Sequence, residues 1–504
     1  MNKYLPVILA LVLASSHAFA QNQTHPSSNM LLDGTISAAQ TETEYTFRQG
    51  YPTGDTAAAS YSNSKLRRAI EAYKTFLPTV ATEAVIQQMT GAGAVFNKVG
   101  IIMAQGPKQQ FAAANSDTPY AFALLDLRNG PMVIEMAANS LLLGVVNDHN
   151  MRWLTNLGGI GPEQGKGGKH LFLPPDYKGA VPDGYFVSRA RTWWVVAAIR
   201  TVPLDGDVPK AINAAQDGIS VYPLTDPDAA SHWRFIDVTE RRLELPLLAW
   251  EGNIAYWREL HGVINSEYPQ DEDRYAMGSL EQLGISANAK FDLDEPTTEL
   301  LNRAARIAHA ELSISLFAND DPKRIMWNDR NWEILPLATM HLPKGDFGTA
   351  GTIAREASDQ FFFFGWGTSS TIGKQEPGGG SVYYSSFKDD SGAYIDGGKT
   401  YRMNIPGPVP MKLFWSATVY DAETRCLIEA PLMRAAVRSH LDQPVVNADG
   451  SYDITFGPEN PGVPESNWVQ TLPRKGWMVT VRLYGPTEDV FNGTWRLGNL
   501  KRIN

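Results

Sequence analysis

The sequence contains very little cysteine, no excess of basic residues and no long apolar run, and each shortage excludes a class of protein. A single cysteine, Cys426, stands among 504 residues, so the chain can form neither an internal disulfide nor a zinc cluster built from cysteines. Acidic residues outnumber basic ones by 54 to 44, for a formal net charge of −10. Because nucleic acids and anionic membranes attract basic surfaces, we expect no nucleic-acid partner.

The first twenty residues have the composition of an export signal. Lys3 precedes an apolar run from Leu5 to Ala14, and the segment ends in Ala18-Phe19-Ala20, a small-x-small sequence. The run is shorter than the roughly 18 residues that a membrane-spanning helix needs, and no later segment is apolar enough to span a bilayer. We therefore expect cleavage after Ala20, no transmembrane anchor in the mature chain, and export to the periplasm, with secretion from the cell as the alternative.

Along the remaining chain, β-type segments lie on both sides of a helical middle. Apolar spacing predicts a helix over residues 64–89, with Pro78 expected to kink or interrupt it. Helical spacing returns between about 240 and 345, where a helix is expected over 297–316 with Pro296 in its first turn. The predicted strands, typical of sandwiches, are 121–127, 132–136, 141–146, 171–174, 185–187, 193–199, 401–405, 413–420, 452–456, 477–483 and 493–497.

Two apolar features of the sequence predict burial. Four consecutive phenylalanines at 361–364 would promote aggregation if exposed, so we expect them in the core between domains. Cys426 is interpreted as a buried structural thiol on a strand, since no nearby histidine offers to activate it as a nucleophile.

Two sets of short motifs follow one another from about residue 60 to the C-terminus. The first includes Asn-Ser-Asp-Thr-Pro-Tyr at 115–120 and Pro-Asp-Gly-Tyr-Phe at 182–186. The second includes Asp-Gly-Gly-Lys-Thr-Tyr at 396–401 and Arg-Leu-Tyr-Gly-Pro at 482–486. The first set resembles the bacterial "domain of unknown function 1254", and the second resembles its usual partner, "domain of unknown function 1214".

The resemblance implies an α+β, mainly β, chain with an immunoglobulin-like β-sandwich domain, a helical middle region and a C-terminal jelly-roll-like β-sandwich. The expected parts are a signal peptide at 1–20, a loose leader at 21–60, a first domain with helix and sandwich at 61–230, a helical region at 231–365 and a last domain at 366–504. The resemblance implies no particular activity, and a fold alone does not define one.

The chain departs from the family pattern at three positions. It has Asn150, Asn156 and His170 where relatives have an aromatic residue, an aspartate and a tyrosine. If these positions line a pocket, the ligand of this chain differs from that of its relatives.

The familiar catalytic signatures are absent, so candidate sites come from polar clusters. The sequence has no Gly-x-Ser-x-Gly elbow and no His-Glu-x-x-His helix. Asn115, Asp117, Thr118 and Tyr120 form one cluster, in which the carboxylate could act as a general base or orient a ligand hydroxyl. Alternatively, Asp117 and Thr118 hydrogen-bond the loop backbone around Pro119.

A second cluster consists of Asp148 and His149, followed by Arg152 and Trp153. Asp148 and His149 are candidates for acid–base chemistry or metal binding. However, adjacent strand residues point to opposite faces, and a metal site needs three or four ligands. We therefore expect no metal and no cofactor.

A third cluster lies in the last domain. The cluster combines planar rings with guanidinium groups, a set that can bind sugar rings, aromatic ligands or carboxylates, and consists of Trp415, Arg434, Trp468, Arg482 and Trp495. The alternative is that the tryptophans fill a sandwich core while the arginines hold loops in place.

These clusters support two functional hypotheses. One is a hydrolase or lyase that acts on a small organic molecule in a cleft between domains, with Asp117 or His149 as acid or base and Arg482 holding an anionic group. The other is a non-catalytic cell-envelope protein that binds a glycan, lipid fragment or protein partner through exposed Trp415 and Trp468. A purely structural role is the third interpretation, and the oligomeric state stays open.

Overall fold

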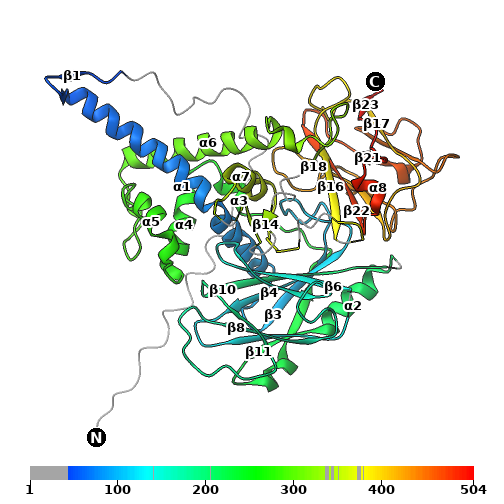
Figure 1. The fold of residues 1–504 in the computed structure, drawn as a ribbon, viewed down its shortest axis with the longest axis horizontal. Helices are drawn as coiled ribbons and strands as arrows, with labels where there is room; N and C mark the ends of the chain where they lie inside the picture. The colour runs from blue at the N-terminus through cyan, green and yellow to red at the C-terminus, as the bar shows by residue number, and fades with distance from the viewer. Residues whose placement is uncertain are drawn as a thin grey trace, which may run out of the picture. The chain divides into compact units, whose positions relative to one another are not determined.

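The computed structural model describes residues 44–139, 141–204, 206–334, 340–341, 345–349, 351–371, 376–378 and 380–503 (Figure 1). All of them belong to one compact unit, Ile36–Asn504. The predicted signal peptide at 1–20 and residues 21–43 of the predicted leader lie outside the described residues.

A short hairpin, β1 (Phe47–Arg48) and β2 (Tyr51–Pro52), leads into a 38-residue helix, α1 (Gly54–Gly91). The helix begins inside the predicted leader, which is therefore too long, and Pro78 lies within the helix without ending it. The expected interruption at Pro78 is wrong because α1 packs along α4, α5 and α6, and this burial outweighs the loss of one backbone hydrogen bond.

The first sandwich consists of two sheets with strand orders β12-β3-β4-β10-β6-β7 and β11-β5-β8-β9. Apolar side chains fill the space between the sheets, as Leu125 and Val195 do from one and Ile134 and Phe172 from the other. Pairing is antiparallel except for β12 with β3 and β8 with β9. The elements are β3 (Val99–Ala104), β4 (Pro119–Asp126), β5 (Met132–Met136), β6 (Leu142–Asp148), β7 (Trp153–Gly158), β8 (Gly168–Leu173), β9 (Phe186–Arg189), β10 (Trp194–Thr201), α2 (Val208–Gly218), β11 (Ile219–Pro223), η1 (Pro227–His232) and β12 (Arg234–Asp237).

The helical region follows the first sandwich. Its helices are α3 (Leu247–Trp250), α4 (Ile254–Ser266), η2 (Asp271–Asp273), α5 (Arg274–Glu281), α6 (Glu295–Phe317), η3 (Pro322–Arg324) and α7 (Arg355–Phe364). Pro296 lies in the first turn of α6, and the Asp294 side chain accepts a 2.9 Å hydrogen bond from the backbone N–H of Thr297. The predicted helix at 297–316 is confirmed. The phenylalanine run ends α7, with Phe361, Phe363 and Phe364 buried and Phe362 half-buried.

Between α6 and α7 the predicted helical spacing does not hold. The described residues there form η3 and three short strands, β13 (Glu333–Ile334), β14 (Met340–His341) and β15 (Asp346–Phe347). Tertiary pairing decides the local structure in this stretch, because β13 joins the edge of the last sandwich through β16.

The last sandwich again has two sheets, β13-β16-β22-β18-β19 and β21-β20-β17-β23. The predicted strand at 493–497 is a loop, in which Trp495 Nε1 donates to the Pro406 carbonyl at 2.9 Å. Cys426 is buried as expected but lies in a turn after β18, not on a strand. The elements are β16 (Ser381–Ser386), β17 (Tyr401–Ile405), β18 (Trp415–Asp421), β19 (Ala436–Arg438), β20 (Tyr452–Gly457), η5 (Glu465–Asn467), β21 (Trp468–Gln470), β22 (Trp477–Tyr484), α8 (Glu488–Phe491) and β23 (Lys501–Arg502).

The α+β class and the order β-rich, helical, β-rich are thus confirmed. The predicted helix over 64–89 is part of α1, which precedes the first sandwich. Within the part of the chain that the structure describes, no helix has both the length and the apolar character needed to cross a bilayer.

Candidate functional site

Asp117 joins the two sandwiches through its side chain. It lies fully buried in the turn before β4, and its Oδ2 accepts hydrogen bonds from Ser416 Oγ on β18 and from the Tyr484 hydroxyl at the end of β22, both at 2.7 Å. Its Oδ1 has no hydrogen-bond partner among the described residues. The alternative prediction, in which the side chains of Asp117 and Thr118 hydrogen-bond the loop backbone around Pro119, is wrong. The Asp117 side chain bonds the last sandwich instead, and Thr118 Oγ1 has no hydrogen-bond partner within the described residues.

Asn115 reinforces the same contact. Its Nδ2 donates to the Tyr484 hydroxyl at 2.9 Å, and its Oδ1 accepts from the backbone N–H of Asp117 at 2.8 Å. Burial, together with the charge of Asp117, raises the pKa of Tyr484 well above its usual value, so this hydroxyl keeps the proton that it donates. The geometry of the 115–117 turn is therefore set by the last sandwich.

The end of β19 holds the turn from the other side. Arg438 NH1 donates to the Ser116 carbonyl at 2.9 Å, and His440 Nε2 lies 3.0 Å from the Asp117 carbonyl. Arg438 itself is fixed by two hydrogen bonds to Asp442, from Nε at 2.9 Å and from NH2 at 2.8 Å. These contacts make residues 115–117 a rigid junction between the sandwiches.

Beside this junction lies a cavity of about 380 Å³ with walls from both sandwiches and from α7 and the segment that follows it. Polar groups on its wall include Asn115, Arg200, Glu376 and Arg482. Much of the remaining wall is apolar. Its aromatic side chains are Phe111, Tyr120, Phe122, Phe361, Phe364, Trp366 and Tyr383, and aliphatic residues such as Leu143, Val145 and Ala198 contribute beside them.

Strand pairing aligns the groups on the last-sandwich side of the cavity. Arg482 on β22 lies between Ser416 on β18 and Tyr383 on β16, directly opposite each across the sheet. Its guanidinium lies 5.6 Å from the ring centroid of Tyr383 and 5.7 Å from that of Tyr420, and its NH2 donates to the Tyr420 hydroxyl. Facing residues across a sheet contact one another, so the guanidinium is held in place by its neighbours.

Arg482 stays positively charged in this environment. Burial by itself lowers the pKa of Arg482, but the oxygens of Tyr420 and Tyr484 and the charge of Asp117 outweigh burial, and the pKa lies above its usual value. On the first-sandwich side, Arg200 on β10 pairs with Tyr120 on β4, and its guanidinium lies 5.7 Å from the Tyr484 ring centroid. Each sandwich therefore contributes one cation to the cavity wall.

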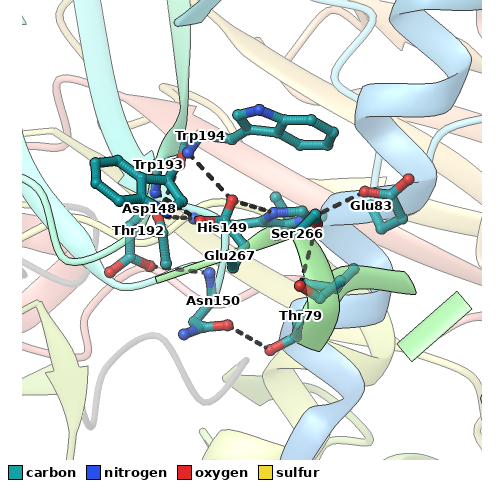
Figure 2. Close-up of polar contacts among 12 residues, drawn as sticks. Thr79, Glu83, Asp148, His149, Asn150, Thr192, Trp193, Trp194, Ser266 and Glu267 are labelled. Atoms are coloured by element: carbon teal, nitrogen blue, oxygen red, sulfur yellow. Dashed lines mark hydrogen bonds and ion pairs between the residues drawn. The ribbon is translucent and has the colours of Figure 1, made fainter. Parts of the chain in front are cut away.

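His149 lies apart from this wall, in the cluster shown in Figure 2. It is fully buried, with Nδ1 2.8 Å from Glu267 Oε1 and Nε2 3.1 Å from Glu83 Oε2. Burial lowers the pKa of His149, but the two carboxylates outweigh burial and raise the pKa to about 9. Both ring nitrogens are engaged, so the imidazolium links α1, the first sandwich and the end of α4.

The neighbours of His149 in the sequence shape the turn from β6 to β7. Asp148 Oδ1 accepts from the backbone N–H groups of Asn150 at 3.0 Å and Arg152 at 2.8 Å, and burial raises the pKa of Asp148. Arg152 pairs with Asp273 at 2.5 Å, and Trp153 Nε1 donates to the Asn156 side chain at 3.0 Å. None of the four residues in this predicted cluster lines the cavity.

The predicted aromatic–arginine cluster of the last domain is divided. Trp415 is fully buried with its ring centroid 5.0 Å from that of Tyr452, and Trp468 is 7% exposed with Nε1 donating to the Gly457 carbonyl. Arg434 NH2 donates to the Trp468 carbonyl at 2.7 Å. These three side chains hold the sandwich together, and only Arg482 of this cluster reaches the cavity.

The positions that depart from the family pattern lie behind the cavity wall or away from it. Asn156 Oδ1 accepts a 2.7 Å hydrogen bond from Ser369 Oγ, and Ser369 lines the cavity. Asn150 bonds Thr79 on α1 at 2.8 Å, and His170 pairs with a buried glutamate at 3.0 Å. Of these three positions, only Asn156 contacts a residue that lines the cavity, and so only its change can directly alter the shape of the cavity.

The sequence analysis missed Arg200, Ser416 and Tyr484. A signal for Arg200 was present, because it is a charged residue inside an otherwise apolar strand run at 194–201. Tyr484 stands two residues after Arg482 and so shares its face of β22, which alternation along a strand predicts. Among the described residues, no group of three or more histidine, cysteine, aspartate or glutamate side chains is arranged to hold a metal ion.

The chain thus consists of two sandwiches joined by helices, with a cavity between the sandwiches. Comparison with other proteins shows which family has this arrangement of domains. Residues 96–223 match the family described as "Protein of unknown function (DUF1254)", and residues 380–488 match "Protein of unknown function (DUF1214)". The chain is a tandem DUF1254–DUF1214 protein. No match was found among curated proteins.

Two solved structures are similar to this chain. The VPA0106 protein of Vibrio parahaemolyticus aligns with a TM-score of 0.52 at 17% identity. The alignment covers 87% of this chain and 100% of the Vibrio chain. An uncharacterized protein of Burkholderia cenocepacia aligns with a TM-score of 0.38 at 13% identity, covering 89% of this chain and 97% of its own. At 17% identity the first likeness concerns the fold alone.

Proposed function

We propose that this chain is an exported protein that binds a small, largely apolar organic molecule in the cavity between its DUF1254 and DUF1214 domains. The observation that carries the proposal is the cavity itself: about 380 Å³, with a largely apolar wall that includes several aromatic rings and some polar groups. Pockets of a few hundred Å³ with this composition are typical of small-molecule sites. Export rests on the sequence of residues 1–20.

The arrangement of Asp117 favours binding over catalysis. A hydrolase or lyase with Asp117 as base requires a carboxylate oxygen that reaches the ligand. Asp117 is not part of the cavity wall, and its Oδ2 already accepts two hydroxyl hydrogen bonds. His149, the other candidate base, is fully buried between two carboxylates.

The same cavity disfavours a glycan as the ligand. Sugar-binding faces combine an accessible aromatic ring with many hydrogen-bonding side chains. Trp415 and Trp468 are buried, and most of the cavity wall is apolar. An apolar body that fills the space between the rings fits the wall better.

The test uses the chain without its predicted export signal, residues 21–504. The protein is incubated with cell-envelope extract and, separately, with the neutral apolar fluorophore N-phenyl-1-naphthylamine. Retained molecules are then identified by mass spectrometry after gel filtration. We expect retention by the wild type and loss in Ala198→Phe, because Ala198 lines the cavity and a ring there fills it.

The control is a variant with a ring added away from the cavity, Ala289→Phe, at an exposed loop position. Equal retention by the wild type and Ala198→Phe would contradict the proposal. Consumption of a retained compound by the wild type would instead support the hydrolase or lyase hypothesis.

A further inference from the structure

We infer that the molecule in the cavity carries a carboxylate, and that Arg482 binds it. This inference rests on the proposed function and names the chemical class of the ligand. Its starting point is the state of Arg482 on the cavity wall: the residue is only 3% exposed, and yet its Nε and NH1 have no hydrogen-bond partner among the described residues.

A buried guanidinium with unpaired N–H groups is stabilised when an anion binds to it. A guanidinium has five N–H donors, and the one on Nε and the two on NH1 are left over when NH2 bonds the Tyr420 hydroxyl. A buried charge without a hydrogen-bonding counter-ion is strongly unfavourable, because water no longer solvates it. Asp117 stabilises the charge from nearby, but its Oδ2 accepts from Ser416 and Tyr484, and its Oδ1 has no hydrogen-bond partner among the described residues.

The guanidinium is also held rigid, as a binding group requires. The Tyr420 hydroxyl that accepts from Arg482 donates in turn to the Ala114 carbonyl at 2.7 Å. Tyr383 and Tyr420 lie on two sides of the guanidinium, 5.6 and 5.7 Å from it. Little side-chain entropy is lost when such a preorganised group binds a ligand.

The charges on the wall define the charge of the ligand. Arg200 and Arg482 are the lining cations within the described part of the wall, and Glu376, which is exposed, is the lining carboxylate. Counted over these lining groups alone, the formal balance is one positive charge, and the buried carboxylate of Asp117 also lies near Arg482. The site therefore matches a monoanion better than a phosphate monoester with nearly two negative charges. Arginine binds carboxylates in a planar, bidentate geometry.

The rest of the wall defines the body of the ligand. Phe111, Phe122, Phe361, Phe364 and Trp366 surround the space next to the arginines. Burying an apolar body against these rings supplies affinity, while the arginine supplies orientation. An aromatic or medium-chain aliphatic carboxylic acid combines both features.

The experiment compares matched pairs of probes that differ in charge alone. Phenylacetate is compared with phenylacetamide, and octanoate with octanamide, by isothermal titration calorimetry and by displacement of N-phenyl-1-naphthylamine from residues 21–504. In the wild type we expect each carboxylate to bind about ten- to a hundredfold more tightly than its amide, the usual range for hydrogen bonds to a charged group. In Arg482→Met the carboxylate should lose this advantage while the amide binds as before.

Arg496→Gln serves as the matched control, because Arg496 is a solvent-accessible arginine outside the cavity that pairs with Asp329 at 3.6 Å. It should keep the preference of the wild type for carboxylates. If Arg482→Met does not fold, as judged by circular dichroism, Arg200→Gln takes its place and should weaken the carboxylates selectively.

The outcomes separate the two proposals. Equal binding of carboxylates and amides by the wild type, or binding of the fluorophore that no carboxylate displaces, overturns the inference and leaves the proposed function standing. Failure of the fluorophore and of all four probes to bind overturns the proposed function itself.

Discussion

The hydroxyl of Tyr484 donates a 2.7 Å hydrogen bond to the carboxylate of Asp117, which lies 367 positions earlier in the chain. Both side chains are buried, and the bond joins the DUF1214 domain to the DUF1254 domain at the edge of the cavity. The same hydroxyl accepts from Asn115 at 2.9 Å, so one oxygen serves two residues of the opposite domain.

Replacing Tyr484 with phenylalanine removes that oxygen without changing the ring. Asp117 then keeps only the hydrogen bond from Ser416, and the Asn115 amide loses its acceptor. Because buried polar groups left unpaired destabilise a fold, we expect the free energy of unfolding to fall by about 1–3 kcal/mol. Urea denaturation measures the change, and Tyr275→Phe, at a position 92% exposed, should have no effect. A loss of similar size in both variants would contradict the role of the bond.

His149 should make stability depend on pH in a predictable direction. Its pKa is raised from 6.5 to about 9 because Glu267 and Glu83 outweigh burial. A raised pKa means that the folded state holds the proton more tightly, so the stabilisation is fully present below pH 6.5 and is lost as pH rises through 9.

The variant His149→Gln tests that direction. It leaves two glutamates without their buried cation, which should cost about 3–5 kcal/mol near pH 6. The difference in melting temperature between wild type and His149→Gln should therefore narrow as pH rises from 6 to above 9. The control is His232→Gln, at an exposed position, which should follow the wild type. A gap that stays constant with pH would contradict the assignment of the proton to His149.

Cys426 should be unreactive in the folded protein. It is 3% exposed, and burial raises the pKa of its thiol to about 12, so the reactive thiolate is scarce at pH 8. We expect its modification by Ellman's reagent to be at least about a hundredfold slower than that of glutathione, and to become fast in urea. Rapid modification of one thiol per chain without denaturant would show that the turn after β18 opens readily.

Gly158 ends β7 in a conformation that a side chain would disturb. Its φ is +72°, and a Cβ there would collide with the backbone oxygen of Leu142. Gly184 has a similar φ of +88° with nothing within 4 Å of the added atom, so it is a matched control for backbone strain alone. We expect Gly184→Ala to lower the free energy of unfolding by about 1–2 kcal/mol, and Gly158→Ala by about 1–3 kcal/mol more. Equal losses in urea denaturation would contradict the collision.

The strands at 132–136 and 401–405 match their predictions because an apolar run in the first and apolar–polar alternation in the second are read directly from a sequence. The start of α1 was missed for the opposite reason. Residues 54–63 are rich in alanine and serine, and all of them except Thr56 are exposed or half-buried, so no apolar periodicity marks them as helix. Their helical state depends instead on the Thr53 cap and on the longer helix that they extend.

The candidate site was predicted only in part. Asn115, Tyr120 and Arg482 were singled out for their chemistry, and they lie on one cavity wall. Asp148 and His149 were singled out in the same way, but neighbours in sequence say nothing about distant partners. The carboxylate that holds His149 Nδ1 lies 118 positions further along the chain. Only the tertiary fold shows that this histidine is already paired with the carboxylates of Glu267 and Glu83.

The junction around Asp117 has a consequence for how the protein is made. Its hydrogen bonds to Ser416 and Tyr484 close loops of 299 and 367 residues, and closure of such loops is slow. During synthesis the first sandwich emerges long before β22. The carboxylate of Asp117 in the 115–117 turn therefore lacks its hydrogen-bond donor on β22 until nearly the whole chain has been made. A product that stops short of residue 477 lacks this partner strand entirely. It should accumulate as a species prone to degradation or aggregation.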